Sequence, residues 1–535
     1  MKFLLLSNVN MQPLLASLKP LEVECGAYNS LLGDLSTARS PATAVDVSHL
    51  LCVFDTDSMM ADALYGVGAP AQCEMFLDGM ESFCGRHPEK VVIANTFCLS
   101  SNRWLGFADL THQNSLKDVE TSLNGRLVSI AKAHPNLLVF DMELLFRRHG
   151  EDALLSNALW YAGRIRYSAR MFELLATTIR QALAAHAQTS RKVLIVDLDN
   201  TLWGGVLGEL GATGVALGED GAGRAFRDFQ RSLKALQRIG VLLAIASKND
   251  QADVEEILDD NPMMILRRED FAAISANWEP KAENIAKIAE QLNLGTDSFV
   301  FIDDNPVERD LVRKFLPEVA VPDFPARVEN LKTWLLRDIA PVYFGKYAIT
   351  AEDEEKTEQY RANTARQKLA ASFDLDGYLR ELNIDCNIQV DAPAQLVRAA
   401  QMTQKTNQFN LTTRRYEVTD LARFVESAEH AVLMLDYRDR FGDEGSVGLA
   451  IIDLAQGRID TFLTSCRVIG RKVETRLLDK AVELCRDRGL QKVIGEYIPS
   501  RKNKMVASFY ENHGFKPLVT TPDGRVTYEK PIDVR

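Results

Sequence analysis

Three short apolar runs in the middle of the chain each end in acidic or hydroxyl side chains, and this pattern restricts the possible folds most strongly. They read VLIVDLDNT at 193–201, LLAIASKND at 242–250 and FVFIDDNP at 299–306. Continuous apolar runs of this length are typical of strands that are buried on both faces of a parallel sheet. Ligand sites in open α/β sheets lie at the carboxyl ends of the strands. The sequence therefore predicts an α/β domain with a polar site along one sheet edge.

The length of 535 residues gives room for about three domains at roughly 100–200 residues each. Hydrophobic residues make up 46% and charged residues 25%, which is ordinary for globular proteins. We expect an α/β domain at 1–188, the α/β domain with the polar edge at 189–345, and a linker helix with an α+β domain at 346–535. The last domain includes a hairpin turn at Gln456-Gly457 between two apolar runs.

Composition and charge argue against several classes of protein. The net charge of −12 lacks the basic footprint of a nucleic-acid binder. No apolar stretch approaches the 18 or more residues of a membrane span, and the first residues, MKFLLLSNVNM, favour a strand over a signal peptide. The eight cysteines form no CxxC pair, which suits a reducing cytosol. We therefore expect a cytoplasmic enzyme without nucleic-acid or membrane partners.

The first of the three strand ends carries two carboxylates, Asp197 and Asp199, in a D-x-D-x-T pattern. The chain turns at the end of a strand, so both side chains can converge on one site. Asp197 can then attack phosphorus and form an aspartyl-phosphate, while Asp199 protonates the leaving oxygen and later activates water. A lone DxD is usually a solvated turn, so this interpretation depends on the other two strand ends.

The other strand ends supply the remaining parts of a phosphoryl-transfer site. Lys281, in NWEPK, can neutralise the transferred phosphoryl group and the nucleophile. Polar side chains that can bind the substrate are Thr201, Ser247, Lys248 and Asn249. Carboxylates that can form a cation site are Asp197, Asp199, Asp303 and Asp304. All-oxygen ligation with room for water favours Mg²⁺ as the cofactor.

This order of strand-DxDNT, strand-Ser, Lys and strand-DD resembles the haloacid dehalogenase (HAD) superfamily. The resemblance implies a HAD-like Rossmannoid fold with a minimal cap, an Asp197 nucleophile, an Asp199 acid/base and Mg²⁺. Several stretches also resemble the FkbH-like proteins of polyketide biosynthesis, among them VLIVDLDNTLWGGVLGE, FAAISANWEPKAENI, TQKTNQFNLTTRRY and FLTSCRVIGRKVE. The match covers most of the chain in the family order, although GELGATG at 208–214 departs from an acidic GEDG-like turn.

In the last domain, the sequence Cys466-Arg467-Val468-Ile469-Gly470 precedes an expected helix at 471–488. This turn resembles the pyrophosphate loop of GNAT acyltransferases, and amides at a helix N-terminus suit phosphate binding. The resemblance implies a GNAT-like α+β domain in which Arg467 and Gly470 bind substrate. Lys472 replaces the small residue that is common at the end of the loop, which either hinders acetyl-CoA or adds a charge for phosphopantetheine.

Two further features of the last domain have alternative interpretations. Cys466 is a candidate acyl acceptor, because nearby cations and a helix N-terminus favour the thiolate, but most free cysteines are buried and inert. The polar segment QKTNQFNLTTRR at 404–415 is either a capped, solvated helix end or a surface that recognises substrate or carrier. In the second interpretation, Asn407 and Asn410 bind substrate.

The first domain resembles an SGNH-type, flavodoxin-like α/β domain in having Ser7-Asn8 directly after the first strand. SGNH hydrolases also need a late His and Asp, and the stretch WYAGRIRYS at 160–168 has neither. We therefore expect a non-hydrolytic domain that binds substrate or carrier. Arg164 and Arg166 are either solvated or bound to an anion.

The FkbH-like resemblance implies a Mg²⁺-dependent glyceryl transferase and phosphatase. D-1,3-bisphosphoglycerate would be dephosphorylated, and its glyceryl group would be loaded onto the phosphopantetheine thiol of an acyl carrier protein to supply polyketide-type extender units. The alternative is a HAD phosphatase that acts on another phosphorylated metabolite and has a GNAT-like accessory domain. A carrier-binding scaffold with an inactive site is a third interpretation, against which the complete set of Asp197, Asp199, Lys281 and Asp303 argues.

Overall fold

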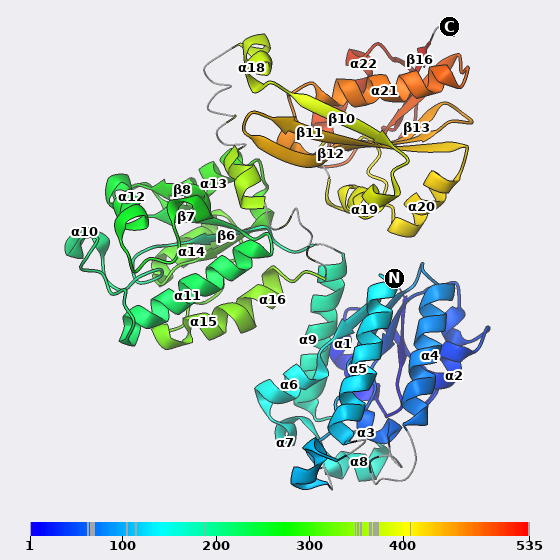
Figure 1. Ribbon diagram of the computed structural model, residues 1–535, viewed down its shortest axis with the longest axis vertical. Coiled ribbons are helices and arrows are strands. Elements are labelled where there is room, and N and C mark those ends of the chain that lie inside the picture. Colours follow the sequence, from blue (N-terminus) through cyan, green and yellow to red (C-terminus); the bar gives the residue numbers. More distant parts are fainter. Residues whose placement is uncertain are drawn as a thin grey trace. The chain divides into compact units, whose positions relative to one another are not determined.

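The computed structural model describes residues 2–60, 64, 70–102, 105–112, 115–187, 189–347, 349, 353, 356–362, 366, 374–406 and 408–532. Contacts divide the chain into two compact units, Met1–Ala187 and Gln188–Arg535 (Figure 1). The second unit holds two separate sheets. The prediction of a mixed α/β chain with parallel sheets is confirmed. Among the described residues, no helix is long and apolar enough to cross a membrane.

The first unit is built on a parallel sheet of five strands in the order β2-β1-β3-β4-β5, the 2-1-3-4-5 order of one group of doubly wound folds. The strands are β1 (Lys2–Leu6), β2 (Glu22–Cys25), β3 (Val47–Cys52), β4 (Val91–Asn95) and β5 (Leu137–Phe140). Alternate side chains of β1 enter two different apolar clusters, one with Leu4 and Leu6 and the other with Phe3 and Leu5. The longer helices that cover the sheet are α4 (Ala71–Arg86), α5 (Leu116–Ala133) and α9 (Ala169–His186).

A four-stranded parallel sheet begins the second unit, with the order β8-β7-β6-β9. Its strands are β6 (Val193–Val196), β7 (Leu242–Ser247), β8 (Phe271–Ala276) and β9 (Phe299–Ile302). One face packs on α11 (Gly221–Arg238) and α15 (Leu331–Trp334), which lie together on one side of the sheet in Figure 1. The other face packs on α13 (Lys281–Leu292) and α14 (Pro306–Phe315). Between β6 and α11, where every residue is described, the one helix is α10 (Leu207–Leu210), so no cap domain is inserted there.

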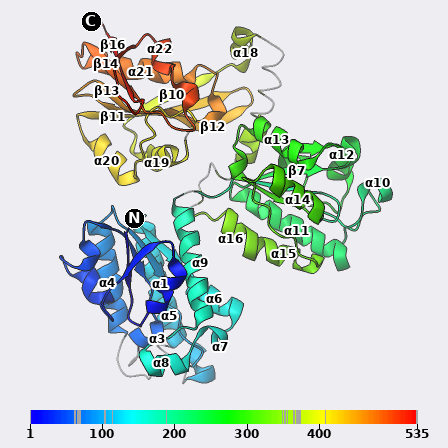
Figure 2. The ribbon, with the colours of Figure 1, turned by 180° about the vertical axis from the view of Figure 1, so that it is seen from behind.

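The second sheet of this unit has seven strands in the order β10-β11-β12-β13-β14-β16-β15, and only β13 and β14 pair in parallel. The strands are β10 (Asp385–Val390), β11 (His430–Asp439), β12 (Gly442–Asp453), β13 (Arg458–Thr464), β14 (Lys492–Tyr497), β15 (Lys516–Thr520) and β16 (Val526–Pro531). The expected turn joins β12 to β13, where Gly457 has a φ of +64° that favours glycine. Helix α21 (Val473–Asp487) covers one face, while α19 (Leu396–Lys405) and α20 (Val418–Glu426) cover the other (Figure 2).

Candidate active site

The carboxyl ends of three neighbouring strands bring Asp197, Ser247 and Asp303 together. Asp197 follows β6, Ser247 ends β7 and Asp303 follows β9, and β6 lies between the other two strands. The Ser247 hydroxyl donates a 2.7 Å hydrogen bond to Asp197 Oδ1. All three side chains are buried, and their strands are continuous apolar runs packed on both faces. The rigid sheet edge therefore fixes where the Asp197 carboxylate points.

Lys281 joins two of these carboxylates. It is the first residue of α13, and its Nζ lies 2.8 Å from Asp197 Oδ1 and 2.6 Å from Asp303 Oδ2. Burial by itself lowers the pKa of Lys281, but the two carboxylates outweigh it and leave the pKa raised. The ammonium is therefore charged at neutral pH. It fixes the two carboxylates relative to each other.

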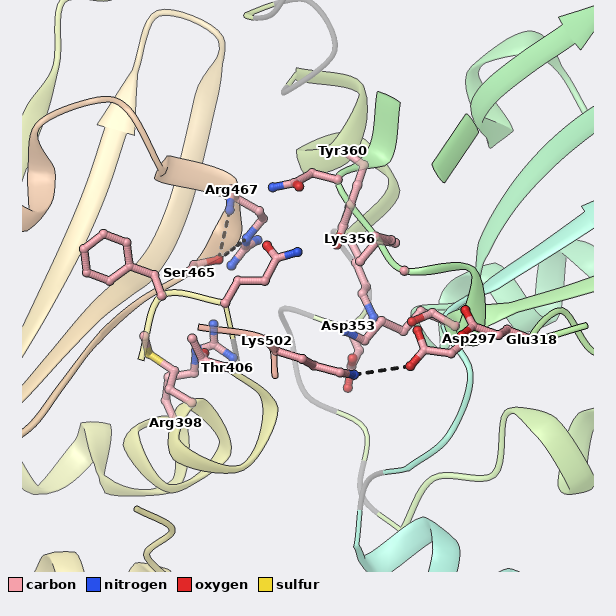
Figure 3. Close-up of a pocket in the computed structure, with 18 residues that line it drawn as sticks. Asp297, Glu318, Asp353, Lys356, Tyr360, Arg398, Thr406, Ser465, Arg467 and Lys502 are labelled. Carbon is pink, nitrogen blue, oxygen red and sulfur yellow. Dashed lines mark hydrogen bonds and ion pairs between the residues drawn. The ribbon is translucent and has the colours of Figure 1, made fainter. Parts of the chain in front are cut away.

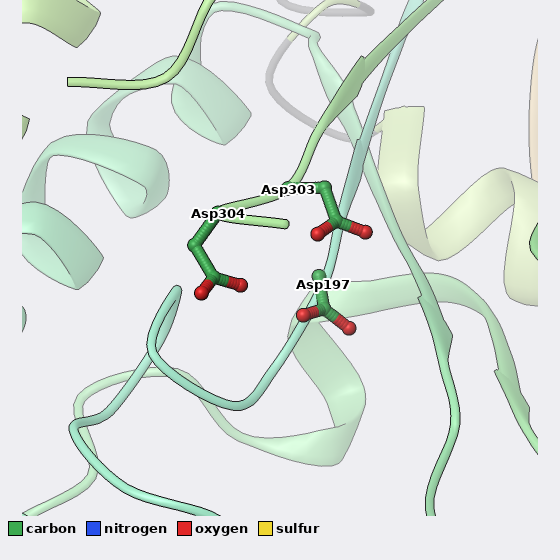
Figure 4. Close-up of side chains that lie close together, drawn as sticks. All are labelled: Asp197, Asp303 and Asp304. Atoms are coloured by element: carbon green, nitrogen blue, oxygen red, sulfur yellow. The ribbon is translucent and has the colours of Figure 1, made fainter. Parts of the chain in front are cut away.

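A cluster of three carboxylates, Asp197, Asp303 and Asp304, can hold a metal ion (Figure 4). One oxygen from each lies within 4.8 Å of the others. Burial, and then the charge of Asp197, raise the pKa of Asp303 to about 6 against the effect of Lys281. The same two causes raise the pKa of Asp304. One ammonium does not neutralise three carboxylates, so this all-oxygen cluster fits a hard divalent cation such as Mg²⁺.

The sequence predicted Asp199 as a metal ligand, but its carboxylate is not among those of the metal cluster. Its Oδ1 accepts hydrogen bonds from Trp203 Nε1 and the Leu207 amide, both at 3.0 Å. Its Oδ2 accepts a 3.0 Å bond from Asn249 Nδ2. These bonds turn the side chain toward the loop after β6. The Asp199 carboxylate is therefore held by these loops and is not grouped with the oxygens of the metal cluster.

The residues predicted to bind phosphate have different surroundings. Asn249 Nδ2 also lies 3.2 Å from Ser247 Oγ, so the amide links Ser247 to Asp199. Lys248 Nζ forms a 2.6 Å ion pair with Glu308 Oε1 of α14. Thr201 is fully buried, and its hydroxyl has no hydrogen-bond partner among the described residues. A buried hydroxyl without a partner is costly and available to a ligand.

In the last sheet, the loop from Ser465 to Lys472 lies between two cavities. Cys466 begins a short 3₁₀ turn, but its side chain lies outside the described part of the structure. Arg467 is buried, and its guanidinium contacts Ser465 Oγ at 3.1 Å and Glu444 Oε2 at 3.3 Å. Gly470 has a φ of +83°, and Lys472 has a φ of 58° immediately before α21. The loop is thus tightly turned, as expected before a helix N-terminus.

One of these cavities is strongly basic. Its volume is about 460 Å³, and four of its eight lining residues are cationic: Arg380, Arg471, Lys472 and Arg476. No Asp or Glu is among the described residues that line it. Arg471 is buried, with its guanidinium 5.3 Å from the centre of the Tyr437 ring. Sequence reasoning identified only Lys472, because Arg380 belongs to α18 (Leu375–Leu382), which lies far from this loop in the sequence.

The other cavity, of about 450 Å³, is shown in Figure 3. Ser465 and Arg467 line one side, and Lys502 faces Asp297 at 3.2 Å. Lys192 and Ser298, which also line it, precede β6 and β9. The cavity therefore lies at the amino ends of these strands, on the edge of the sheet opposite to the carboxylate cluster.

Asn410 is used by the fold. It is fully buried, and its Oδ1 accepts a 2.8 Å bond from the Thr413 amide. The main chain of 409–411 bonds to Phe462 and Thr464 of β13, where β13 and β14 pair directly at one position only. The Asn503 amide also donates to the Asn410 carbonyl at 2.8 Å. The segment thus fills the opening between the two strands, and Asn407, the other predicted binder, lies outside the described residues.

Solved structures that resemble the chain include a phosphatase domain. The crystal structure of the N-terminal part of BF1531 from Bacteroides fragilis, containing a phosphatase domain complexed with Mg, is 28% identical, covers 65% of this chain and 95% of that chain, and has a TM-score of 0.60. The chain thus resembles a phosphatase structure over about two thirds of its length.

Two acetyltransferase structures match a smaller part. The ribosomal-protein-S18-alanine N-acetyltransferase from Escherichia coli is 15% identical and covers 28% of this chain and 96% of its own, with a TM-score of 0.23. The GNAT domain of S. lividans PAT is 18% identical. The match covers 28% of this chain and 90% of that chain, also with a TM-score of 0.23. No family model and no curated protein matches the chain.

In the first unit, the residues considered for hydrolysis or anion binding have internal partners. Ser7 is buried, and its hydroxyl accepts a 3.2 Å bond from the Val9 amide. Arg166 pairs with Asp55 at 3.3 Å and with Asp57 at 2.8 Å. Both ion pairs line a cavity of about 470 Å³. Two carboxylates already oppose the single guanidinium, so Arg166 does not offer an anion an excess of positive charge.

Proposed function

We propose that the chain is a Mg²⁺-dependent phosphatase of the HAD type that is coupled to glyceryl transfer onto an acyl carrier protein. The observation that carries the phosphatase part is the contact of Lys281 with both Asp197 and Asp303, beside a cluster of three carboxylates. A buried excess of negative charge at the end of parallel strands fits a site that binds a cation and a phosphoryl group. The similarity to a Mg-bound phosphatase structure at 28% identity supports the same assignment.

Asp197 performs the first step. One of its carboxylate oxygens forms a bond to phosphorus while the bond from phosphorus to the leaving oxygen breaks. The leaving oxygen takes a proton from Asp199, whose carboxyl group is fixed by Trp203, Leu207 and Asn249. The Ser247 hydroxyl and the Lys281 ammonium hold the nucleophile and bind the transferred oxygens. Mg²⁺, when bound by Asp197, Asp303 and Asp304, supplies charge neutralisation for the phosphoryl oxygens.

The second step regenerates the carboxylate. Asp199 now accepts a proton from water, and the water oxygen bonds to phosphorus as the bond to Asp197 breaks. Inorganic phosphate leaves, and Asp199 is again protonated for the next substrate. The two carboxylates thus have different roles because one faces the cation cluster and the other faces the loop after β6.

The glyceryl-transfer part rests on the loop from Ser465 to Lys472 and the basic cavity beside it. D-1,3-bisphosphoglycerate carries an acyl phosphate, so a thiolate sulfur can bond to its C1 carbon while the bond from C1 to the phosphate oxygen breaks. The four cations that line this cavity give it a local positive charge that suits the phosphate of a phosphopantetheine arm. The thiolate belongs either to Cys466 or to the carrier, and both routes end in a glyceryl thioester on the carrier.

Intact-mass measurements on enzyme and carrier test this proposal. Wild-type enzyme with D-1,3-bisphosphoglycerate, holo-carrier and Mg²⁺ should give a glyceryl adduct on the carrier and free phosphate. Cys466→Ala should lose any adduct on the enzyme. EDTA should stop removal of the phosphate that is not on C1. Phosphate release without acylation of enzyme or carrier would contradict glyceryl transfer and favour the alternative, a phosphatase that acts on another metabolite.

A further inference from the structure

The rim of the carboxylate site carries an exposed tryptophan. Trp278 lies three residues before Lys281, in the loop between β8 and α13, and is 70% exposed. Trp203, on the loop after β6, is by contrast fully buried. An indole combines a large, rigid apolar face with a polar N–H, and tryptophan is enriched where proteins contact a partner.

The Trp278 ring is held in place by the neighbouring loop. Its Nε1 donates a 3.1 Å hydrogen bond to Asp250 Oδ1. Asp250 adjoins Asn249, which contacts both Asp199 and Ser247. The Asn277 amide also donates to the Ser247 carbonyl at 3.2 Å, so the loops after β7 and β8 are joined by two bonds. A ring that is tied to residues of the site has a fixed orientation and loses little freedom when a ligand covers it.

The position of Trp278 indicates which substrates can reach it. Asp197 follows β6 and Trp278 follows β8, with β7 between them. At roughly 5 Å per strand spacing, the two loops start about 10 Å apart. Three carbons are joined by two bonds of about 1.5 Å and span at most about 3 Å, so the carbon chain of a three-carbon acid bound at Asp197 ends short of the Trp278 loop. A longer group that leaves the site in this direction crosses the indole.

On the side of the site away from Trp278, toward β9, an ion pair connects two elements. Lys248, after β7, reaches Glu308 of α14 at 2.6 Å, and this pair connects the loop over β7 to the helix beyond β9. Arg309 of the same helix donates to the main-chain carbonyls of Asp303 and Asp304 at 2.7 and 2.8 Å. The side toward β8 therefore presents an exposed indole, while the side toward β9 carries the Lys248–Glu308 ion pair and the Arg309 guanidinium.

We propose that Trp278 contacts the extended group that carries the phosphate, so that the site prefers a phosphate at the end of a long, flexible arm over a free three-carbon phosphate. This inference rests on the proposed phosphatase activity. It adds the substrate class, a phosphomonoester borne on an arm such as pantetheine, and a specificity residue for that class. Trp278 acts in binding, and the chemical steps stay with Asp197 and Asp199.

The test compares two substrates that differ in length, D-3-phosphoglycerate and the 3-phosphoglyceryl thioester of pantetheine. We expect Trp278→Ala to raise KM for the pantetheine substrate about tenfold. KM for D-3-phosphoglycerate, and kcat for both, should stay within about twofold. Phe315→Ala, which removes another exposed ring at the far end of α14, is the matched control and should change neither KM.

A second pair of variants tests the hydrogen bond between Trp278 and Asp250. Asp250→Asn keeps an oxygen acceptor for the indole and should leave both KM values unchanged, whereas Asp250→Ala should raise only the KM of the pantetheine substrate, by a few-fold. Equal KM values in wild type and Trp278→Ala, or equal increases for both substrates, would overturn the inference. If wild-type enzyme hydrolyses neither substrate, the proposed phosphatase function itself is contradicted.

Discussion

The two charged sites of the second unit have opposite compositions. At the carboxyl edge of the four-stranded sheet, three carboxylates cluster, and the Lys281 ammonium pairs with two of them, Asp197 and Asp303. At the start of α21, four cations line a cavity without a described lining carboxylate. The first site therefore attracts a cation and the second attracts an anion. The difference shows that one chain of net charge −12 carries both a strongly acidic sheet edge and a strongly basic cavity.

The largest expected effect comes from removing the nucleophile at the acidic site. Asp197→Asn keeps the size of the side chain but cannot form an aspartyl-phosphate, so kcat for phosphate release should fall by at least about 10³-fold. Phosphate release from acetyl phosphate with Mg²⁺ measures this. Asp310→Asn, on the exposed surface of α14, is the control and should leave kcat unchanged. A value for Asp197→Asn within tenfold of wild type would contradict the assignment.

Removing the Lys281 ammonium should have the next largest effect, which we expect in the free energy of unfolding. Lys281→Met leaves buried carboxylates without their partner, which costs about 3–5 kcal/mol in the free energy of unfolding. Urea unfolding without Mg²⁺ measures the loss, and saturating Mg²⁺ should recover part of it by relieving the repulsion. Lys287→Met is the control on the same helix, because Lys287 is exposed and its loss should cost less than about 0.5 kcal/mol. An equal loss of unfolding free energy in the two variants would show that the buried contacts of Lys281 do not stabilise the fold more than an exposed ion pair does.

Substitutions at the basic cavity should have a smaller effect, and only on the rate of glyceryl transfer. Arg476→Ala and Arg380→Ala should each slow glyceryl transfer to the carrier about three- to tenfold, and the effect should shrink at high salt. Phosphate release from acetyl phosphate should stay unchanged, since the carboxylate cluster lies on another sheet. Arg423→Ala, on α20 at the other face of the same sheet, is the matched control. Transfer rates that match the control at low salt would exclude this cavity as the carrier site.

The smallest effect concerns the hydroxyl of Thr201. Thr201→Val replaces a buried, unpartnered hydroxyl by a methyl group and should raise the free energy of unfolding by about 1 kcal/mol. If the hydroxyl also binds phosphate, as the sequence predicts, KM for acetyl phosphate rises a few-fold. Thr201→Ser retains the hydroxyl and should keep the wild-type KM. A loss of stability in Thr201→Val would mean that the hydroxyl has a structural role.

The acidic site could be predicted from sequence because each residue directly follows or ends a recognisable strand. Asp197, Ser247 and Asp303 occupy the carboxyl ends of adjacent strands, and that adjacency follows from the general rules for parallel sheets. The position of Asp199 outside the metal cluster depends on bonds from Trp203, Leu207 and Asn249, and no local pattern specifies these bonds. The strand order determines where the site lies, whereas individual hydrogen bonds determine how each carboxylate is oriented within it.

The basic site could be predicted only in part. Lys472 lies in the loop that the sequence identified, but Arg380 reaches the cavity through packing between elements far apart in the chain. The same limit applies to Asn410, whose polarity suggested a ligand although the structure uses it to close the gap beside β13. It also applies to Arg166, which pairs with Asp55 and Asp57 over more than a hundred residues. Long-range partners of polar side chains have no signature in a single sequence.

Trapping the covalent intermediate tests the central claim most directly. In Asp199→Asn, the good leaving group of acetyl phosphate needs no proton, so Asp197 is still phosphorylated, but water is no longer activated. Acid quenching followed by peptide mass mapping should find one phosphoryl group on the peptide that contains Asp197, and only when Mg²⁺ is present. An unmodified Asp197, with phosphate released at the wild-type rate, would contradict the account.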